Sequence, residues 1–147
     1  MFRQKEKNNR KRKIELIKNT KNILNKKNRF AKINIDGNKR EDEFLFILCS
    51  NTIHTGKGMK AAPYAKLDDG LLDIILVRSN IPKLSLISLL LKIFKGNHIK
   101  SKYVQYMQVK NIELIPAIDE AINIDGDVKH TTPVKISVLA KKLPIYY

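Results

Sequence analysis

The sequence predicts a mainly β fold, an antiparallel β-sandwich domain with one amphipathic helix packed on it and a basic helix at its N-terminus. Short apolar or alternating runs recur along the chain, and Asp-Gly pairs stand at three of their ends. Only one long run in the centre has helical spacing. Because strands and helices do not alternate, the pattern argues against a Rossmann-type parallel sheet.

Length and charge define the class of protein and its expected partners. The 147 residues are 43% hydrophobic and 29% charged, which is typical of one globular domain. The formal net charge is +15, and residues 1–30 hold twelve Lys and Arg residues against two Glu. This charge indicates a polyanionic partner, either nucleic acid or an anionic membrane surface. The scarcity of Arg weakens direct readout of a DNA sequence and so disfavours nucleic acid. An AT-rich coding bias would also explain the excess of Lys.

The N-terminal residues, the apolar runs and the cysteine content indicate where in the cell the protein is expected. Residues 1–13 are expected to form a disordered basic tail, and residues 14–147 a single domain whose first helix covers about residues 12–27. No apolar segment of signal-peptide type follows the basic start, and the run at residues 84–94 is too short to span a bilayer. We therefore expect a cytoplasmic chain, peripheral to the membrane. Cys49 is the sole cysteine and is expected to be a buried hydrophobe rather than a nucleophile.

The predicted strands begin with an alternating run at residues 30–35, which Asp36-Gly37 ends. After a longer polar loop, residues 44–49 form its buried antiparallel partner. The remaining predicted strands cover residues 71–77, 103–109, 111–115, 121–124 and 134–139. The pair Asp125-Gly126 predicts a hairpin between the last two of these strands.

One helix is predicted over residues 83–95, begun by Pro82 at its first position and capped by Gly96. Its polar side chains form one narrow stripe, made of Ser85, Ser88, Lys92 and Lys95. The broad apolar remainder is most simply core or interface, with lipid contact as an alternative.

The segment from residue 51 to 73 concentrates special backbone residues. Gly56, Gly58 and Gly70 can adopt positive φ, and Pro63 fixes its own φ, so a rigid irregular segment is expected. The Gly56-Lys57-Gly58 loop lacks P-loop spacing and is weak evidence for a phosphate cradle.

Two Asp-Gly turns carry candidate chemistry. In Lys66-Leu-Asp-Asp-Gly-Leu71, carboxylates and main-chain carbonyls gather in a tight turn that suits Mg²⁺. In the second turn, Asp125 and Asp127 lie on either side of Gly126, and one of them could accept a proton from a substrate hydroxyl. Turn formation alone is the simpler explanation of each pair. The three His residues are scattered, so a zinc site is not expected.

Taken together, these motifs resemble the C-terminal domain of the soluble diacylglycerol kinase and sphingosine kinase family of lipid kinases. The matching order is Ile-Asp-Gly at 35–37, the glycine loop, Ala-Pro-Tyr-Ala at 62–65, the Lys66 turn, Phe-Lys-Gly-Asn-His at 94–98, and Ile-Asp-Gly-Asp at 124–127. In that family a β-sandwich domain packs against a nucleotide-binding domain, and a lipid hydroxyl is phosphorylated from ATP between them.

The resemblance implies roles for individual residues. Asp69 would bind a structural Mg²⁺ through its side chain, and Lys66 and Leu71 would bind it through main-chain carbonyls. Asp127 occupies the position of the family's general base, which is ordinarily Glu and longer by one methylene. Lys57 stands where the family usually has a glycine.

The Gly-Gly-Asp-Gly-Thr loop of the family's nucleotide domain does not occur in this sequence. We therefore expect a truncated or split lipid kinase, inactive alone, whose ATP-binding half is supplied in trans, with a lipid such as diacylglycerol as substrate. Exposure of the face that meets the missing half also predicts self-association, so a homodimer is an alternative partner. A non-catalytic basic module that binds anionic membrane or RNA through residues 3–29 is the rival hypothesis.

Overall fold

The computed structural model of the chain describes residues 28–56 and 58–139. The predicted basic tail, the predicted helix over residues 12–27 and the residue Lys57 lie outside these ranges. The described elements are β1 (Arg29–Ile35), β2 (Asn38–Ser50), β3 (Leu72–Arg78), α2 (Lys83–Lys92), the 3₁₀ turns η1 (Ile93–Lys95) and η2 (Asn97–Lys100), β4 (Val104–Val109), β5 (Asn111–Pro116), β6 (Ala121–Ile124), β7 (Asp127–Thr131) and β8 (Val134–Ser137).

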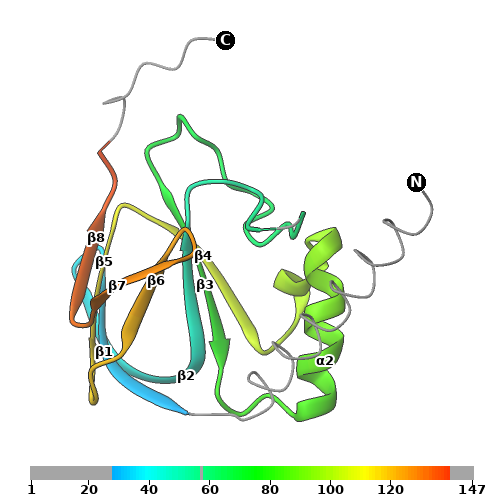
Figure 1. Cartoon of the computed structure of the whole chain (residues 1–147), viewed down its shortest axis with the longest axis horizontal. Helices are drawn as coiled ribbons and strands as arrows, with labels where there is room; N and C mark the ends of the chain where they lie inside the picture. Colours follow the sequence, from blue (N-terminus) through cyan, green and yellow to red (C-terminus); the bar gives the residue numbers. More distant parts are fainter. Residues whose placement is uncertain (1–27, 57, 140–147) are drawn as a thin grey trace.

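The described strands form two antiparallel sheets, which confirms the predicted fold class (Figure 1). The large sheet has the order β4-β3-β2-β1-β5-β8, and the small sheet is the β6-β7 hairpin. Strand β2 joins the two halves of the large sheet, because its first part pairs with β1 and its second part pairs with β3. An irregularity between Phe44 and Phe46 marks the change of partner.

The prediction of a longer polar loop between the first two strands is wrong, because a two-residue turn joins them. Asp36 and Gly37 both have positive φ, 48° and 89°, and they form a two-residue hairpin turn that pairs Ile35 directly with Asn38. A turn with two positive φ values matches the twist of the flanking strands. The polar residues 38–43 therefore belong to β2, where they are mostly exposed.

The prediction that strand 121–124 pairs with strand 134–139 is also wrong. The Asp125-Gly126 turn leads into β7, which the sequence analysis did not predict, and β7 pairs with β6. The last strand, β8, pairs with β5 in the large sheet instead. The hairpin therefore stands in front of the large sheet as a separate unit (Figure 1).

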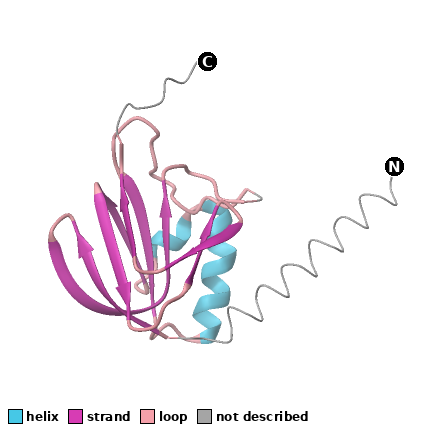
Figure 2. Ribbon diagram, turned by 60° about the vertical axis from the view of Figure 1, so that its left-hand side comes forward, coloured by secondary structure: helices cyan, strands magenta, loops and turns pink. Residues whose placement is uncertain are grey.

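Helix α2 packs by one side against the large sheet (Figure 2). Leu86 and Leu89 of the helix and Ile81 before it are buried against Leu45 and Val77. Gly96, the predicted C-terminal cap, has a φ of 72° and caps the turn η1, which continues from the end of α2 at Lys92. Pro82 occupies the N-cap position, one residue before its predicted place. No helix of the described residues is long and apolar enough to cross a membrane.

The opposite face of the large sheet carries the larger apolar cluster. Its buried members are Ala31, Ile33, Phe44, Leu72, Ile74, Leu76, Val109 and Ile112. Cys49 is half-buried against this cluster, and burial raises the pKa of its thiol to about 11. A thiol with so high a pKa is a poor nucleophile at neutral pH, which supports its packing role.

Candidate functional site

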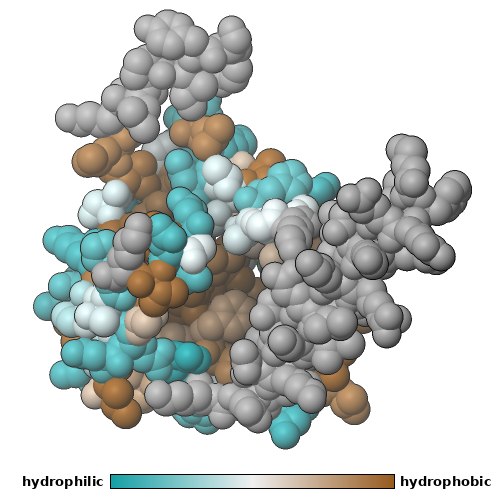
Figure 3. All heavy atoms as spheres, in the orientation of Figure 1, coloured by the Kyte–Doolittle hydropathy of each residue, from teal (hydrophilic) through white to brown (hydrophobic). Residues whose placement is uncertain are grey.

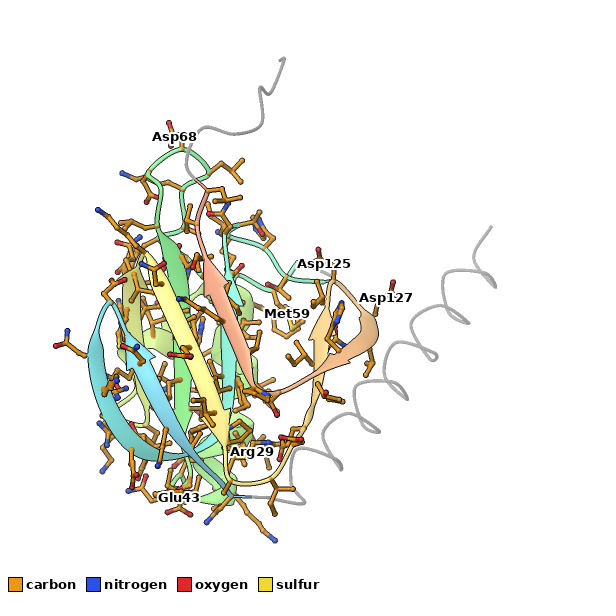
Figure 4. All side chains as sticks on the ribbon, turned by 90° about the vertical axis from the view of Figure 1, so that its left-hand side faces the viewer. Arg29, Glu43, Met59, Asp68, Asp125 and Asp127 are labelled. Atoms are coloured by element: carbon orange, nitrogen blue, oxygen red, sulfur yellow. The ribbon has the colours of Figure 1, made fainter. Side chains whose placement is uncertain are left out.

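The Asp125-Gly126 turn places two carboxylates at the tip of the small sheet. Asp125 and Gly126 have φ values of 51° and 99°, and the Gly126 N–H donates to Asn123 Oδ1 at 2.8 Å. Asp127 follows as the first residue of β7 and pairs with Ile124. Both carboxylates are exposed and project from the tip of the hairpin (Figure 4). A carboxylate in this position can meet a substrate or a second protein surface.

The base of the same hairpin is held by polar contacts. The Glu120 N–H donates to Thr132 Oγ1 at 2.8 Å, and the Thr132 N–H donates to the Glu120 carbonyl at 2.9 Å. The Arg29 guanidinium forms an ion pair with the Glu120 carboxylate and also donates to the Leu45 carbonyl. These contacts connect the hairpin to β1 and β2, so the tip is carried by an anchored unit.

The glycine loop lies toward the same side of the molecule as this tip. Figure 4 shows Met59 together with Asp125 and Asp127 on that side. The loop closes on itself, because the Thr55 N–H donates to the Met59 carbonyl at 2.9 Å. The predicted positive φ values are confirmed at Gly56 and Gly58, at 60° and 83°.

The residues after the glycine loop are fastened to the end of the helix. The Lys60 N–H donates to the Ile93 carbonyl at 3.1 Å. His98 is buried, and its Nε2 lies 2.9 Å from the Ala61 carbonyl oxygen. Burial lowers the pKa of His98, which favours a neutral ring that donates to that oxygen. Gly96 packs so closely on Pro63 that an added Cβ would approach the proline Cβ to 3.0 Å.

The predicted cation site lies in an exposed turn. Asp69 Oδ1 accepts the N–H of Leu71 at 2.9 Å, so the carboxylate folds back over the residue whose carbonyl is a predicted ligand. Gly70 has the predicted positive φ, 70°. A carboxylate with the carbonyls of Lys66 and Leu71 is a set of hard oxygen donors, which fits Mg²⁺. Within the described ranges, no group of three or more His, Cys, Asp or Glu side chains is placed to hold a metal ion.

The structure does not bring the two predicted sites together. Asp68, which neighbours the cation turn, lies at a different end of the molecule from Asp125 and Asp127 (Figure 4). A cation at this turn would therefore stabilise the loop and would not touch the hairpin carboxylates.

Sequence reasoning missed a buried polar group in strand β3. Asp73, in the apolar strand β3, is fully buried, and its Oδ1 accepts hydrogen bonds from the Tyr106 hydroxyl and from Gln108 Nε2. Burial, together with the hydrogen bond to Asp73, raises the pKa of Tyr106. The Tyr106 ring also packs edge-on against Tyr64, with centroids 5.6 Å apart. A lone carboxylate in an apolar strand was the available signal in the sequence.

A pocket of about 350 Å³ lies elsewhere, between the β1-β2 turn and β5. Asp36 forms part of its wall, and the Asp36 carboxylate accepts the main-chain N–H groups of Lys110 and Asn111. The hydrogen bond from Lys110 lowers the pKa of Asp36. None of the predicted site residues lines this pocket.

Comparison with known proteins places these features in a family. Residues 10–147 match a family described as the YegS C-terminal NAD kinase beta sandwich-like domain. Sphingosine kinase 1 of Arabidopsis thaliana is 36% identical over 102 residues, which cover 65% of this chain and 21% of that protein. A diacylglycerol kinase of Staphylococcus aureus (strain bovine RF122 / ET3-1) is 30% identical over 116 residues, which cover 78% of this chain and 36% of that protein.

Solved structures show the same fold. A structure titled as a diacylglycerol kinase from Bacillus anthracis str. Sterne matches with a TM-score of 0.63 at 23% identity, over 82% of this chain and 42% of that one. Another structure from the same source has a TM-score of 0.69 at 24% identity, over 84% of this chain and 42% of that one. The chain thus spans about a fifth to two fifths of these proteins. From the match over residues 10–147, the chain belongs to the family of YegS C-terminal NAD kinase beta sandwich-like domains.

Proposed function

We propose that this chain is the lipid-substrate half of a lipid kinase of the diacylglycerol kinase type. Together with a nucleotide-binding half, it would phosphorylate a lipid hydroxyl. The observation that carries the proposal is the anchored β6-β7 hairpin, which presents Asp125 and Asp127 on the side where the glycine loop lies. The proposal is also supported by the names of two relatives, a sphingosine kinase and a diacylglycerol kinase.

In this proposal Asp127 is the general base. Its carboxylate accepts the proton of the lipid hydroxyl as that oxygen bonds to the γ-phosphorus of ATP. The bond from that phosphorus to the bridging oxygen breaks, and ADP leaves with the electron pair. Asp125, on the other side of Gly126, is the alternative proton acceptor. ATP supplies the phosphoryl group and would be held by the partner half.

A structural Mg²⁺ is proposed at the Asp69 turn. The Asp69 carboxylate and the main-chain carbonyls of Lys66 and Leu71 would hold it, with water completing the shell. The ion would neutralise the carboxylate and fix the entry into β3. Because this turn lies apart from Asp127, the ion would take no part in the proton transfer.

The lipid and the second half need a surface to contact. Figure 3 shows an apolar area at the centre of one face, over β2, β3 and β4 and between the hairpin and α2. Such an area suits an acyl chain, such as that of diacylglycerol, or the apolar face of a partner domain. An anionic membrane surface is the expected source of the lipid, and a second copy of this chain is the alternative partner.

Reconstitution from two pieces tests the proposal. The part of the Staphylococcus diacylglycerol kinase outside the 116 matched residues would serve as the nucleotide-binding half. Mixing it with this chain is expected to give ATP-dependent phosphorylation of diacylglycerol, and neither piece alone should do so. The matched control is the same half with its own C-terminal part. If that control is active and the mixture with this chain is not, the proposal is wrong.

A further inference from the structure

The outer side of α2 and η1 carries exposed apolar side chains. Leu84, Ile87, Leu91 and Phe94 are 81%, 38%, 70% and 42% exposed. Their spacing of three, four and three residues places them on one side of a helix, away from the buried Leu86 and Leu89. The sequence pattern predicts instead that only the narrow polar stripe of the helix faces water.

The charged residues of the sequence around this helix are of one sign. Residues 74–112 contain seven Lys and Arg residues and no Asp or Glu. Lys83, Lys92 and Lys95 are exposed on the helical segment itself. On a helix of 3.6 residues per turn, the first three exposed apolar positions fall within an arc of about 60°, with Lys83 on one side of the arc and Lys92 on the other. The result is an apolar stripe bordered by ammonium groups.

We propose that this stripe, defined by Leu84, Ile87, Leu91 and Phe94, docks the protein on a bilayer that carries anionic lipids. The apolar side chains would enter the boundary between headgroups and acyl chains, and the flanking lysines would contact the headgroups. This inference deepens the proposed function, on which it rests, by naming the surface that meets the source of the lipid.

The charge pattern favours a bilayer over other occupants. In a symmetric dimer the same patch meets itself, so two copies would bring their lysines together. Four protruding apolar side chains do not match a nucleic-acid backbone, which is charged and polar. An anionic bilayer satisfies both the apolar stripe and the lysines that border it.

Cosedimentation of the full chain with vesicles tests the inference without using activity. We compare vesicles of phosphatidylcholine alone with vesicles containing 30% phosphatidylglycerol. The Leu84→Gln/Leu91→Gln variant is expected to lower the partition coefficient on the anionic vesicles at least tenfold. Its matched control is Ile118→Gln/Val128→Gln, which removes exposed apolar side chains outside the helix and should stay within twofold of wild type.

The contribution of charge needs its own pair of variants. Lys83→Gln/Lys92→Gln/Lys95→Gln is expected to lower binding at least tenfold, whereas Lys32→Gln/Lys39→Gln/Lys135→Gln, which removes the same charge from exposed strand positions, should lower it much less. Equal losses for the two triple variants would show attraction by net charge alone and would overturn the inference. Failure of the wild-type chain to bind anionic vesicles would overturn it as well.

Fluorescence distinguishes this helix from the basic residues near the N-terminus as the docking segment. The chain has no Trp, so Leu91→Trp introduces a single reporter on the stripe, and Ile118→Trp introduces a control. Anionic vesicles are expected to shift the Leu91→Trp emission to shorter wavelength and to leave the control unchanged. If the protein sediments with vesicles but the Leu91→Trp emission does not move, another segment docks and the inference is wrong. Reconstituted kinase activity is a separate readout, so failure here leaves the proposed function standing.

Discussion

Single carboxylates with the same local sequence have different environments in this fold. Asp36 and Asp125 each stand first in an Asp-Gly turn with positive φ. The Asp36 carboxylate turns back to accept N–H groups of Lys110 and Asn111, whereas Asp125 projects from its hairpin. The Asp36 carboxylate thus fastens one hairpin turn to the next, and Asp125 remains available for another function.

The Asp36 contact predicts a specific loss of stability in acid. Its pKa in the folded chain lies below the ordinary value of 3.8, so its contribution is complete above that pH and is lost as pH falls through the folded pKa. We expect the free energy of unfolding of Asp36→Asn to fall less steeply than that of wild type below pH 4, as measured by urea unfolding from pH 2 to 7. Asn tolerates the positive φ, so the turn is retained.

The matched control for this experiment is Asp125→Asn, at the same position of the other turn. It is expected to follow the wild-type curve in acid. An Asp36→Asn curve parallel to wild type at every pH would contradict the assigned role of Asp36.

The Asp69 turn can be tested through Mg²⁺ binding. A ligand that binds only the folded state raises its stability, so Mg²⁺ should raise the Tm of the wild-type chain. Asp69→Asn should abolish this shift, while its amide oxygen can still accept the Leu71 N–H and keep the turn. Asp68→Asn is the neighbouring control. A shift that survives in Asp69→Asn but disappears in Asp68→Asn would move the site to the other carboxylate.

At the scale of elements, the irregular segment after β2 is held against the end of the helix. Its main chain bonds to η1 through Lys60, and its Ala61 carbonyl meets the buried His98 of η2. Pro63 lies against Gly96, where an added Cβ would come within 3.0 Å of the proline Cβ. The loop therefore depends on the helix end for its conformation.

Two glycine variants measure this dependence. Gly96→Ala and Gly37→Ala both place a side chain at positive φ, which costs about 1–2 kcal/mol in each case. Only Gly96→Ala also brings a Cβ against Pro63, since nothing lies within 4 Å of the corresponding atom at Gly37. We expect Gly96→Ala to lower the free energy of unfolding by more than Gly37→Ala does, in urea titrations. Equal losses of unfolding free energy in the two variants would mean that the loop around Pro63 can move away from the added Cβ without a loss of stability.

The elements that sequence could predict are those with a buried face. The strands around Ile33, Ile74 and Ile112 and the helix containing Leu86 and Leu89 bury apolar side chains at regular spacing. Strand β7 and the first part of β2 are polar and largely exposed, so no hydrophobic period marks them. Their pairing comes from two-residue turns, whose geometry the Asp-Gly pairs did indicate.

The candidate site was predictable only in part, for a related reason. Local motifs identified Asp69, Asp125 and Asp127 as candidates, and the structure puts the last two on one hairpin tip. The Arg29 and Glu120 pair and the Asp73 and Tyr106 pair join residues 91 and 33 positions apart. Contacts over such separations depend on the tertiary fold and leave no local pattern.

At the scale of the whole molecule, three exposed features have separate places. The hairpin presents carboxylates, the Asp69 turn presents oxygen donors, and the α2 stripe presents apolar and basic groups. Such a layout suits a domain that contacts a lipid surface with one part and a second protein domain with another. In the proposed reaction, the decisive step is removal of the hydroxyl proton by Asp127.

The rate of diacylglycerol phosphorylation by the reconstituted pair tests that step most directly, with Asp127→Asn and Asp127→Glu compared with wild type. Asn keeps the shape and removes the proton acceptor, so the rate should fall by about 10²–10⁴-fold. Glu restores the length usual in the family and should raise the rate, because about 1 Å at a reacting group can change it ~10²-fold. Asp125→Asn should retain most of the wild-type rate. A rate that is unchanged in Asp127→Asn and lost in Asp125→Asn would contradict the account.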